Sequence, residues 1–135
     1  MRNFIKIIEE TETFSRLYHC SPRENLASIK STGLDPSKSK WSSSVYLAGD
    51  EGHARGYEGH HQQTESVILM INVSRLDQSK LGPDDVDLPD CLDDPDEWDN
   101  FDWQESIKIC GQCCYNDVIP PSAIQYRAGD DWLPV

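Results

Sequence analysis

The chain has 135 residues, of which 37% are hydrophobic, and its formal net charge is −12 at pH 7. This length fits one folded domain, so we expect residues 1–135 to form a single unit. No apolar stretch approaches the roughly 18 residues that a membrane-spanning helix needs, so no membrane partner is predicted. The N-terminal apolar run is interrupted by Lys6 and ends in glutamates, which is untypical of a signal peptide and favours a cytoplasmic location.

The acidic residues are concentrated in one segment. Residues 84–105 contain eleven Asp and Glu and no Lys or Arg, so the rest of the chain is close to neutral. We expect this segment to be an acidic loop insertion at the surface, held against the body by Trp98, Phe101 or Trp103. Direct nucleic-acid binding is disfavoured because carboxylates repel phosphates, whereas a basic partner could dock on such a surface.

The first half of the chain predicts short strands and two short helices. Strands are expected at 3–8 and 15–20, and a helix follows in which Ser21 caps the start and Gly33 ends the last turn. A strand at 45–49 then precedes a short helix at 50–59.

The second half predicts three further strands. Residues 65–73 form an apolar run typical of a strand buried on both faces, and strands are also expected at 108–118 and 123–129. The predicted fold is α+β, a small single domain with a mostly antiparallel split sheet and two short helices.

The five cysteines are expected to be reduced thiols rather than metal ligands. Cys110, Cys113 and Cys114 lie close together, but the chain offers no second pair of ligands at comparable spacing for a structural zinc site. Burial of these thiols in strands is favoured, and we predict no metal.

A relay of histidine and tyrosine residues is the chain's most informative motif. The sequence has LYHCS at 17–21, VYLAGD at 45–50 and a further tyrosine, Tyr57, eleven residues after Tyr46. The relay resembles the core of the ADP-ribosyltransferase superfamily, in its diphtheria-toxin-like branch with a His–Tyr–Glu triad. It is also similar to the C-terminal lobe of RNA 2′-phosphotransferases. The resemblance covers residues 15–73 well and 107–127 loosely, and it implies an ADP-ribosyltransferase-like fold with NAD as a substrate.

The resemblance implies a role for each residue of the relay. His19 would bind the adenine-proximal ribose, and Ser21 matches the small hydroxyl residue that follows in the family. Cys20 stands where the family usually has a glycine whose backbone grips the nicotinamide amide. Tyr46 matches the triad tyrosine, and Tyr57 matches a second tyrosine that stacks on the nicotinamide.

The triad glutamate is replaced by Gln112. Glutamine keeps a hydrogen bond but loses the charge, which could cost about 2–4 kcal/mol of transition-state stabilisation. Glu105 or an aspartate of the acidic segment is a candidate to replace that charge. We expect His19, Tyr46 and Tyr57 to converge on one cleft with Gln112 on the facing strand, and side chains of His19 and Gln112 on opposite sheet faces would exclude NAD binding.

Two functions follow from these residues. The first is NAD-dependent ADP-ribosyl transfer to a macromolecular or small-molecule acceptor, of which a protein is one candidate, with His19, Tyr46 and Gln112 in the catalytic site. The alternative is a catalytically weak or inactive binding or inhibitor protein that engages a basic partner through its acidic segment. Cys20 and Gln112 favour the alternative, whereas the retained relay favours the enzyme.

Overall fold

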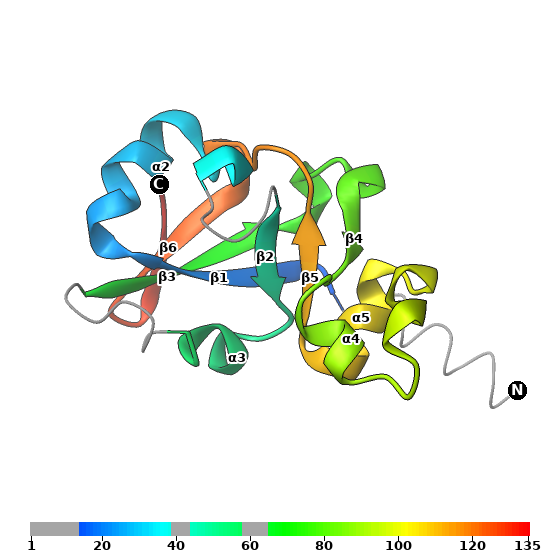
Figure 1. Cartoon of the computed structure of the whole chain (residues 1–135). Coiled ribbons are helices and arrows are strands. Elements are labelled where there is room, and N and C mark those ends of the chain that lie inside the picture. The colour runs from blue at the N-terminus through cyan, green and yellow to red at the C-terminus, as the bar shows by residue number, and fades with distance from the viewer. Residues whose placement is uncertain (1–13, 39–43, 58–64) are drawn as a thin grey trace, which may run out of the picture.

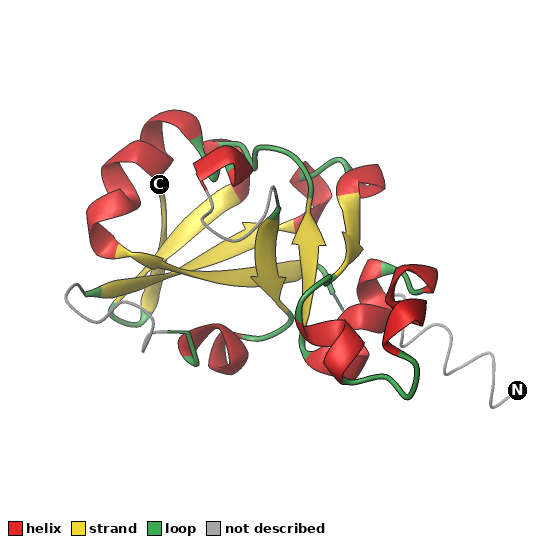
Figure 2. Ribbon diagram, in the orientation of Figure 1, coloured by secondary structure: helices red, strands yellow, loops and turns green. Residues whose placement is uncertain are grey.

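The computed structural model describes residues 14–38, 44–57 and 65–135, and these form one antiparallel sheet with short helices around it (Figures 1 and 2). The sheet has seven strands in the order β4-β5-β2-β1-β3-β6-β7. The strands are β1 (Arg16–Pro22), β2 (Val45–Ala48), β3 (Ser66–Asn72), β4 (Leu81–Pro83), β5 (Gln112–Tyr115), β6 (Ile124–Ala128) and β7 (Asp131–Pro134). The prediction of a small α+β domain with an antiparallel sheet is confirmed. The predicted strand at 3–8 lies outside the described residues.

The helices correct the prediction of two short helices and an irregular acidic loop. The α-helices are α2 (Leu26–Thr32), α3 (Glu51–Arg55), α4 (Asp87–Asp90) and α5 (Trp103–Cys110). The acidic segment therefore contains α4, a 3-10 helix at Pro95–Asn100 and the start of α5. Asp102 explains part of the error, because its side chain accepts the Glu105 N–H in a capping box that starts α5. Acidic residues that suggested a loop act here as helix caps.

The start of the first helix is also corrected. Ser21 does not cap it, because β1 pairs with β3 as far as Pro22, opposite Ser66. A 3-10 turn at Arg23–Asn25 follows, and α2 begins only at Leu26. The predicted end is confirmed, since the Gly33 N–H donates to the Ile29 carbonyl oxygen at the C-terminus of α2.

The sheet is nearly divided between β1 and β2. Those strands pair at one position, Tyr18 opposite Ala48, whereas β1 and β3 pair at seven positions. Figure 1 shows β2 and β5 crossing β1 at a steep angle. Beyond this single contact the ladder between β1 and β2 is missing, and this break in the pairing is called the gap below.

Side chains on the two faces of the sheet form separate apolar clusters. Leu17, Leu47 and Cys113 lie in the larger cluster, which α2 covers with Ile29. The smaller cluster on the other face contains Cys20, Ala48, Ala54 and Ile68. β3 contributes to both faces, and its residues 67–71 are all buried, which confirms the expected strand.

The second half of the chain differs from prediction at three strands. The strand expected at 108–118 is only Gln112–Tyr115, because α5 continues to Cys110. β4 and β7 were not predicted. All five cysteines are free; Cys20, Cys113 and Cys114 are buried in strands as expected, whereas Cys110 is helical and Cys91 is exposed.

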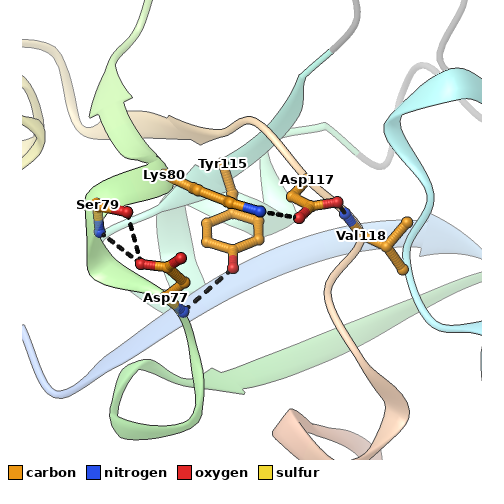
Figure 3. A network of polar contacts seen from close by, with 6 residues as sticks. All are labelled: Asp77, Ser79, Lys80, Tyr115, Asp117 and Val118. Carbon is orange, nitrogen blue, oxygen red and sulfur yellow. Dashed lines mark hydrogen bonds and ion pairs between the residues drawn. The ribbon is translucent and has the colours of Figure 1, made fainter.

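A polar network joins the chain around β4 to the end of β5 (Figure 3). Asp77 accepts hydrogen bonds from the Ser79 backbone and hydroxyl, and its own N–H donates to the Tyr115 hydroxyl at 3.2 Å. Lys80 forms an ion pair with Asp117. Among residues 14–38, 44–57 and 65–135, no helix combines the length and apolar character needed to cross a membrane.

Candidate functional site

Gln112 is the centre of a buried hydrogen-bond network at the start of β5. Gly111, in the left-handed conformation at φ 91°, ends α5 and turns the chain directly into Gln112. The Gln112 side chain is buried, and its Nε2 donates to Asp84 Oδ2 at 2.5 Å and to Asp87 Oδ2 at 2.7 Å. Its Oε1 accepts from the Tyr57 hydroxyl at 2.5 Å. Both amide hydrogens and the amide oxygen are therefore engaged.

Asp84 is a fully buried carboxylate, which corrects the expectation that the whole acidic segment lies at the surface. Its Oδ1 accepts from the backbone N–H groups of Val86 at 2.7 Å and Asp87 at 2.6 Å. The Ser106 hydroxyl accepts from the Asp84 N–H at 3.0 Å and donates to the Gln112 carbonyl oxygen at 2.7 Å. Burial raises the pKa of the Asp84 carboxyl, and the backbone N–H groups of Asp87 and Val86, which donate to Oδ1, offset part of that rise.

Tyr57 follows α3 and directs its hydroxyl into the same network. The hydroxyl lies 2.5 Å from Gln112 Oε1 and 3.2 Å from Asp87 Oδ2, so its one proton is shared between two acceptors. Burial, and then the negative charge of Asp87, raise the pKa of Tyr57 to about 12. The ring also meets the His53 ring edge-on, with centroids 5.9 Å apart. Tyr57 is therefore a neutral hydrogen-bond donor at physiological pH.

His19 lies at the gap between β1 and β2. Its Nδ1 is 2.7 Å from the Tyr46 carbonyl oxygen, and because a carbonyl only accepts, Nδ1 carries the proton. Strand alternation places Tyr18, Ala48 and Gln112 on one face and starts the His19 side chain from the other. The His19 ring reaches the β2 backbone at Tyr46, but His19 and Gln112 start from opposite faces of the sheet, so the expectation that they converge on one cleft is wrong. The hydrogen bond from His19 to Tyr46 therefore joins β1 to β2 where the two strands have no paired residues.

The remaining relay residues lie beside this gap. The Tyr46 hydroxyl donates to Asp85 Oδ1 at 2.9 Å, on the face that carries Gln112. Cys20 is buried in the smaller apolar cluster, against which the Tyr57 ring packs. Its thiol occupies space that a glycine would leave open. Ser21 is buried too, and its hydroxyl donates to the Pro22 carbonyl oxygen at 3.4 Å.

The predicted residues form two groups. Tyr57 and Gln112 are in direct contact, and His19 contacts the backbone of Tyr46. Sequence reasoning named an aspartate of the acidic segment as a candidate, but it could not single out Asp84, Asp85 or Asp87, because the only signal was the acidity of the segment. Glu105 does not join either group, since it is exposed and accepts from the Asp102 N–H in the α5 capping box.

The site is strongly negative. Within the described ranges, Asp84 and Asp87 form no ion pair with a lysine, arginine or histidine. The same ranges contain no group of three or more His, Cys, Asp or Glu side chains arranged to hold a metal ion. A positive charge that develops beside Asp87 would therefore meet an uncompensated carboxylate.

No protein-family model matches the chain, and no curated protein matches it either.

Proposed function

We propose that the protein binds NAD where β1, β2, β5 and α3 meet and transfers its ADP-ribose to an acceptor. The proposal is carried by one observation: Tyr57 and the half-buried carboxylate of Asp87 meet at Gln112, the residue that opens β5. An aromatic ring, a hydrogen-bond donor and a negative charge are thereby close together. Binding of nicotinamide requires an aromatic surface and a hydrogen-bond donor. The ribose cation that forms when nicotinamide leaves requires a negative charge.

The chemistry requires charge stabilisation more than proton transfer. When the bond between nicotinamide and ribose breaks, its electron pair leaves with nicotinamide and the ribose becomes an oxocarbenium-like cation. An oriented carboxylate beside this cation lowers the barrier without needing to reorganise during the reaction. In this proposal Asp87 supplies the charge that Gln112 lacks, and the Gln112 amide holds Asp87 in position at 2.7 Å.

His19 and Tyr46 would hold the remainder of the dinucleotide. The hydrogen bond from Nδ1 to the Tyr46 carbonyl fixes the His19 ring against β2, and the family resemblance gives this histidine a role in binding ribose. The Tyr46 ring, fixed by its hydroxyl on Asp85, offers a second aromatic surface beside the gap between β1 and β2. Fixing these groups before binding reduces the entropy cost of positioning NAD.

A binding or inhibitor protein is the second candidate, and three observations favour it. His19 and Gln112 start from opposite faces of the sheet, which is the arrangement expected to count against NAD binding. The Cys20 thiol occupies the small apolar cluster beneath Tyr57, which narrows the space for a nicotinamide ring. Gln112 has all its polar atoms engaged within the protein. On this reading the fold has lost turnover, and the acidic segment engages a basic partner.

Labelled NAD separates the two candidates. The purified protein is incubated with NAD labelled in the adenosine part, with and without cell lysate, and its melting temperature is measured with and without NAD. We expect an NAD-dependent thermal shift and transfer of label, both reduced in His19→Ala. Asp90→Asn, an exposed substitution in the same acidic segment, should behave as wild type. If wild type shows neither a shift nor cleavage, the enzyme proposal is overturned in favour of the binding protein.

A further inference from the structure

A hollow lies next to the candidate site, because its wall includes Asp85, which accepts a hydrogen bond from the Tyr46 hydroxyl. It has a volume of about 230 Å³, and its walls include Trp98, Asp85, Asp99 and Cys114. Cys114 is two residues after Gln112 on β5, so both side chains lie on the same face of the sheet. The hollow is smaller than the roughly 300–1,000 Å³ of typical small-molecule pockets, which favours one side chain over a whole dinucleotide.

Trp98 is the unusual member of this wall. Trp103 packs on the main core and against Phe14, with ring centroids 6.3 Å apart, as expected of a residue that holds the acidic segment in place. Trp98 is half-buried and belongs to neither apolar cluster of the described residues. Its indole lines the hollow instead. An aromatic side chain in the wall of a hollow can provide a surface on which a cation stacks.

The wall also contains two carboxylates, and none of its described lining residues is cationic. Asp85 is held by the Tyr46 hydroxyl, which donates to its Oδ1 at 2.9 Å. Asp99 is exposed and makes no hydrogen bond or ion pair with its side chain among residues 14–38, 44–57 and 65–135. Lys80, at the end of the 3-10 helix before β4, is already paired with Asp117.

We propose that this hollow binds the guanidinium group of an arginine side chain on a protein partner. A guanidinium is planar, so it stacks on an indole face while its N–H groups donate to carboxylates at its edge, whereas an ammonium is a strongly hydrated point charge. The net charge of −12 draws a basic partner towards this face. The inference goes beyond the proposed function, because the hollow binds arginine whether or not the protein cleaves NAD. If NAD is cleaved, the position of the hollow beside Gln112 makes the bound partner the acceptor.

The test uses ¹⁵N-labelled protein and the tryptophan indole N–H signals, without NAD. N-acetyl-arginine-N-methylamide is titrated at constant ionic strength, and the Trp98 signal is assigned from its loss in Trp98→Leu. We expect a saturable shift of the Trp98 signal and none of the Trp132 signal. The citrulline analogue, which has nearly the same shape without the charge, should give no shift. The lysine analogue should bind more weakly than the arginine compound.

Two carboxylate variants complete the design. Asp99→Asn should weaken arginine binding about two- to fivefold, as expected for one exposed charged contact, while Asp96→Asn, in the same 3-10 helix but outside the hollow, should leave it unchanged. Equal binding of arginine, lysine and citrulline compounds, equal effects of the two variants, or no shift at Trp98 would each overturn the assignment. Each of these outcomes is independent of whether NAD binds.

Discussion

Replacing Gln112 by glutamate tests the network at the start of β5 through protein stability. The Gln112 amide donates to Asp84 at 2.5 Å and to Asp87 at 2.7 Å, so Gln112→Glu would set a third carboxyl against two others. Three carboxylates at this spacing cannot all ionise, so one takes up a proton. Keeping a glutamic acid protonated at pH 7 costs about 4 kcal/mol, because its ordinary pKa is about 4.3 and each unit corresponds to about 1.4 kcal/mol.

The same reasoning fixes how the cost depends on pH. The variant has a carboxyl pKa raised in the folded state, so its relative stability is lost as pH rises above the unfolded value. The protonation cost should lower the free energy of unfolding by about 4 kcal/mol at pH 7 and by about 1 kcal/mol at pH 5. The loss of one hydrogen bond adds a further cost that is the same at both pH values. Urea denaturation of wild type and variant at both pH values measures it. Gln125→Glu, the same change on β6, should cost less than about 0.5 kcal/mol. A Gln112→Glu protein as stable as wild type at both pH values would contradict the close approach of the Gln112 side chain to Asp84 and Asp87.

Two further predictions concern local backbone structure. Gly33 and Gly129 have φ of 79° and 62°, but a Cβ at Gly33 would lie 2.0 Å from the Ile119 carbonyl oxygen whereas one at Gly129 would meet nothing within 4 Å. Gly129→Ala should therefore cost about 1–2 kcal/mol in urea denaturation and Gly33→Ala clearly more, and equal costs would contradict the close approach. Asp102→Ala removes the acceptor of the α5 capping box and should lower stability by about 1 kcal/mol, whereas Asp93→Ala, which caps no helix, should not.

Elements with a strong local signal could be predicted from the sequence. The apolar run that forms β3 is buried on both faces, the Asp50 side chain caps α3 by accepting from the His53 N–H, and Gly33 ends α2. In each case the deciding residues are within a few positions of the element. Periodicity and capping preferences are sufficient to find such features.

Features that depend on distant partners could not be predicted. The acidic composition of residues 84–105 suggested a solvated loop, yet Asp84 is fully buried because Gln112, 28 residues later, donates to it. The start of the first helix was misplaced for a similar reason. Ser21 and Pro22 have the composition of a helix cap, but pairing with β3 keeps them in β1. Long-range pairing therefore outweighed local preference at both places.

Only the site residues that lie at the spacing of a known motif could be predicted from the sequence. His19, Tyr46 and Tyr57 were identified from the relay and Gln112 from the family resemblance, and the structure places Tyr57 in contact with Gln112. No spacing rule indicated that Asp87 would join them. The short α4 that carries Asp87 follows buried Asp84, and the two were brought to β5 by the fold.

The central claim is that Asp87 supplies the charge that ADP-ribosyl transfer needs. It is tested most directly by measuring nicotinamide release from NAD by wild type, Asp87→Asn and the exposed control Asp90→Asn at equal protein concentration. We predict that wild type and Asp90→Asn release nicotinamide at the same rate, and that Asp87→Asn is slower by about 30- to 1000-fold while its NAD-dependent thermal shift is retained. Release by Asp87→Asn at the wild-type rate would contradict the account.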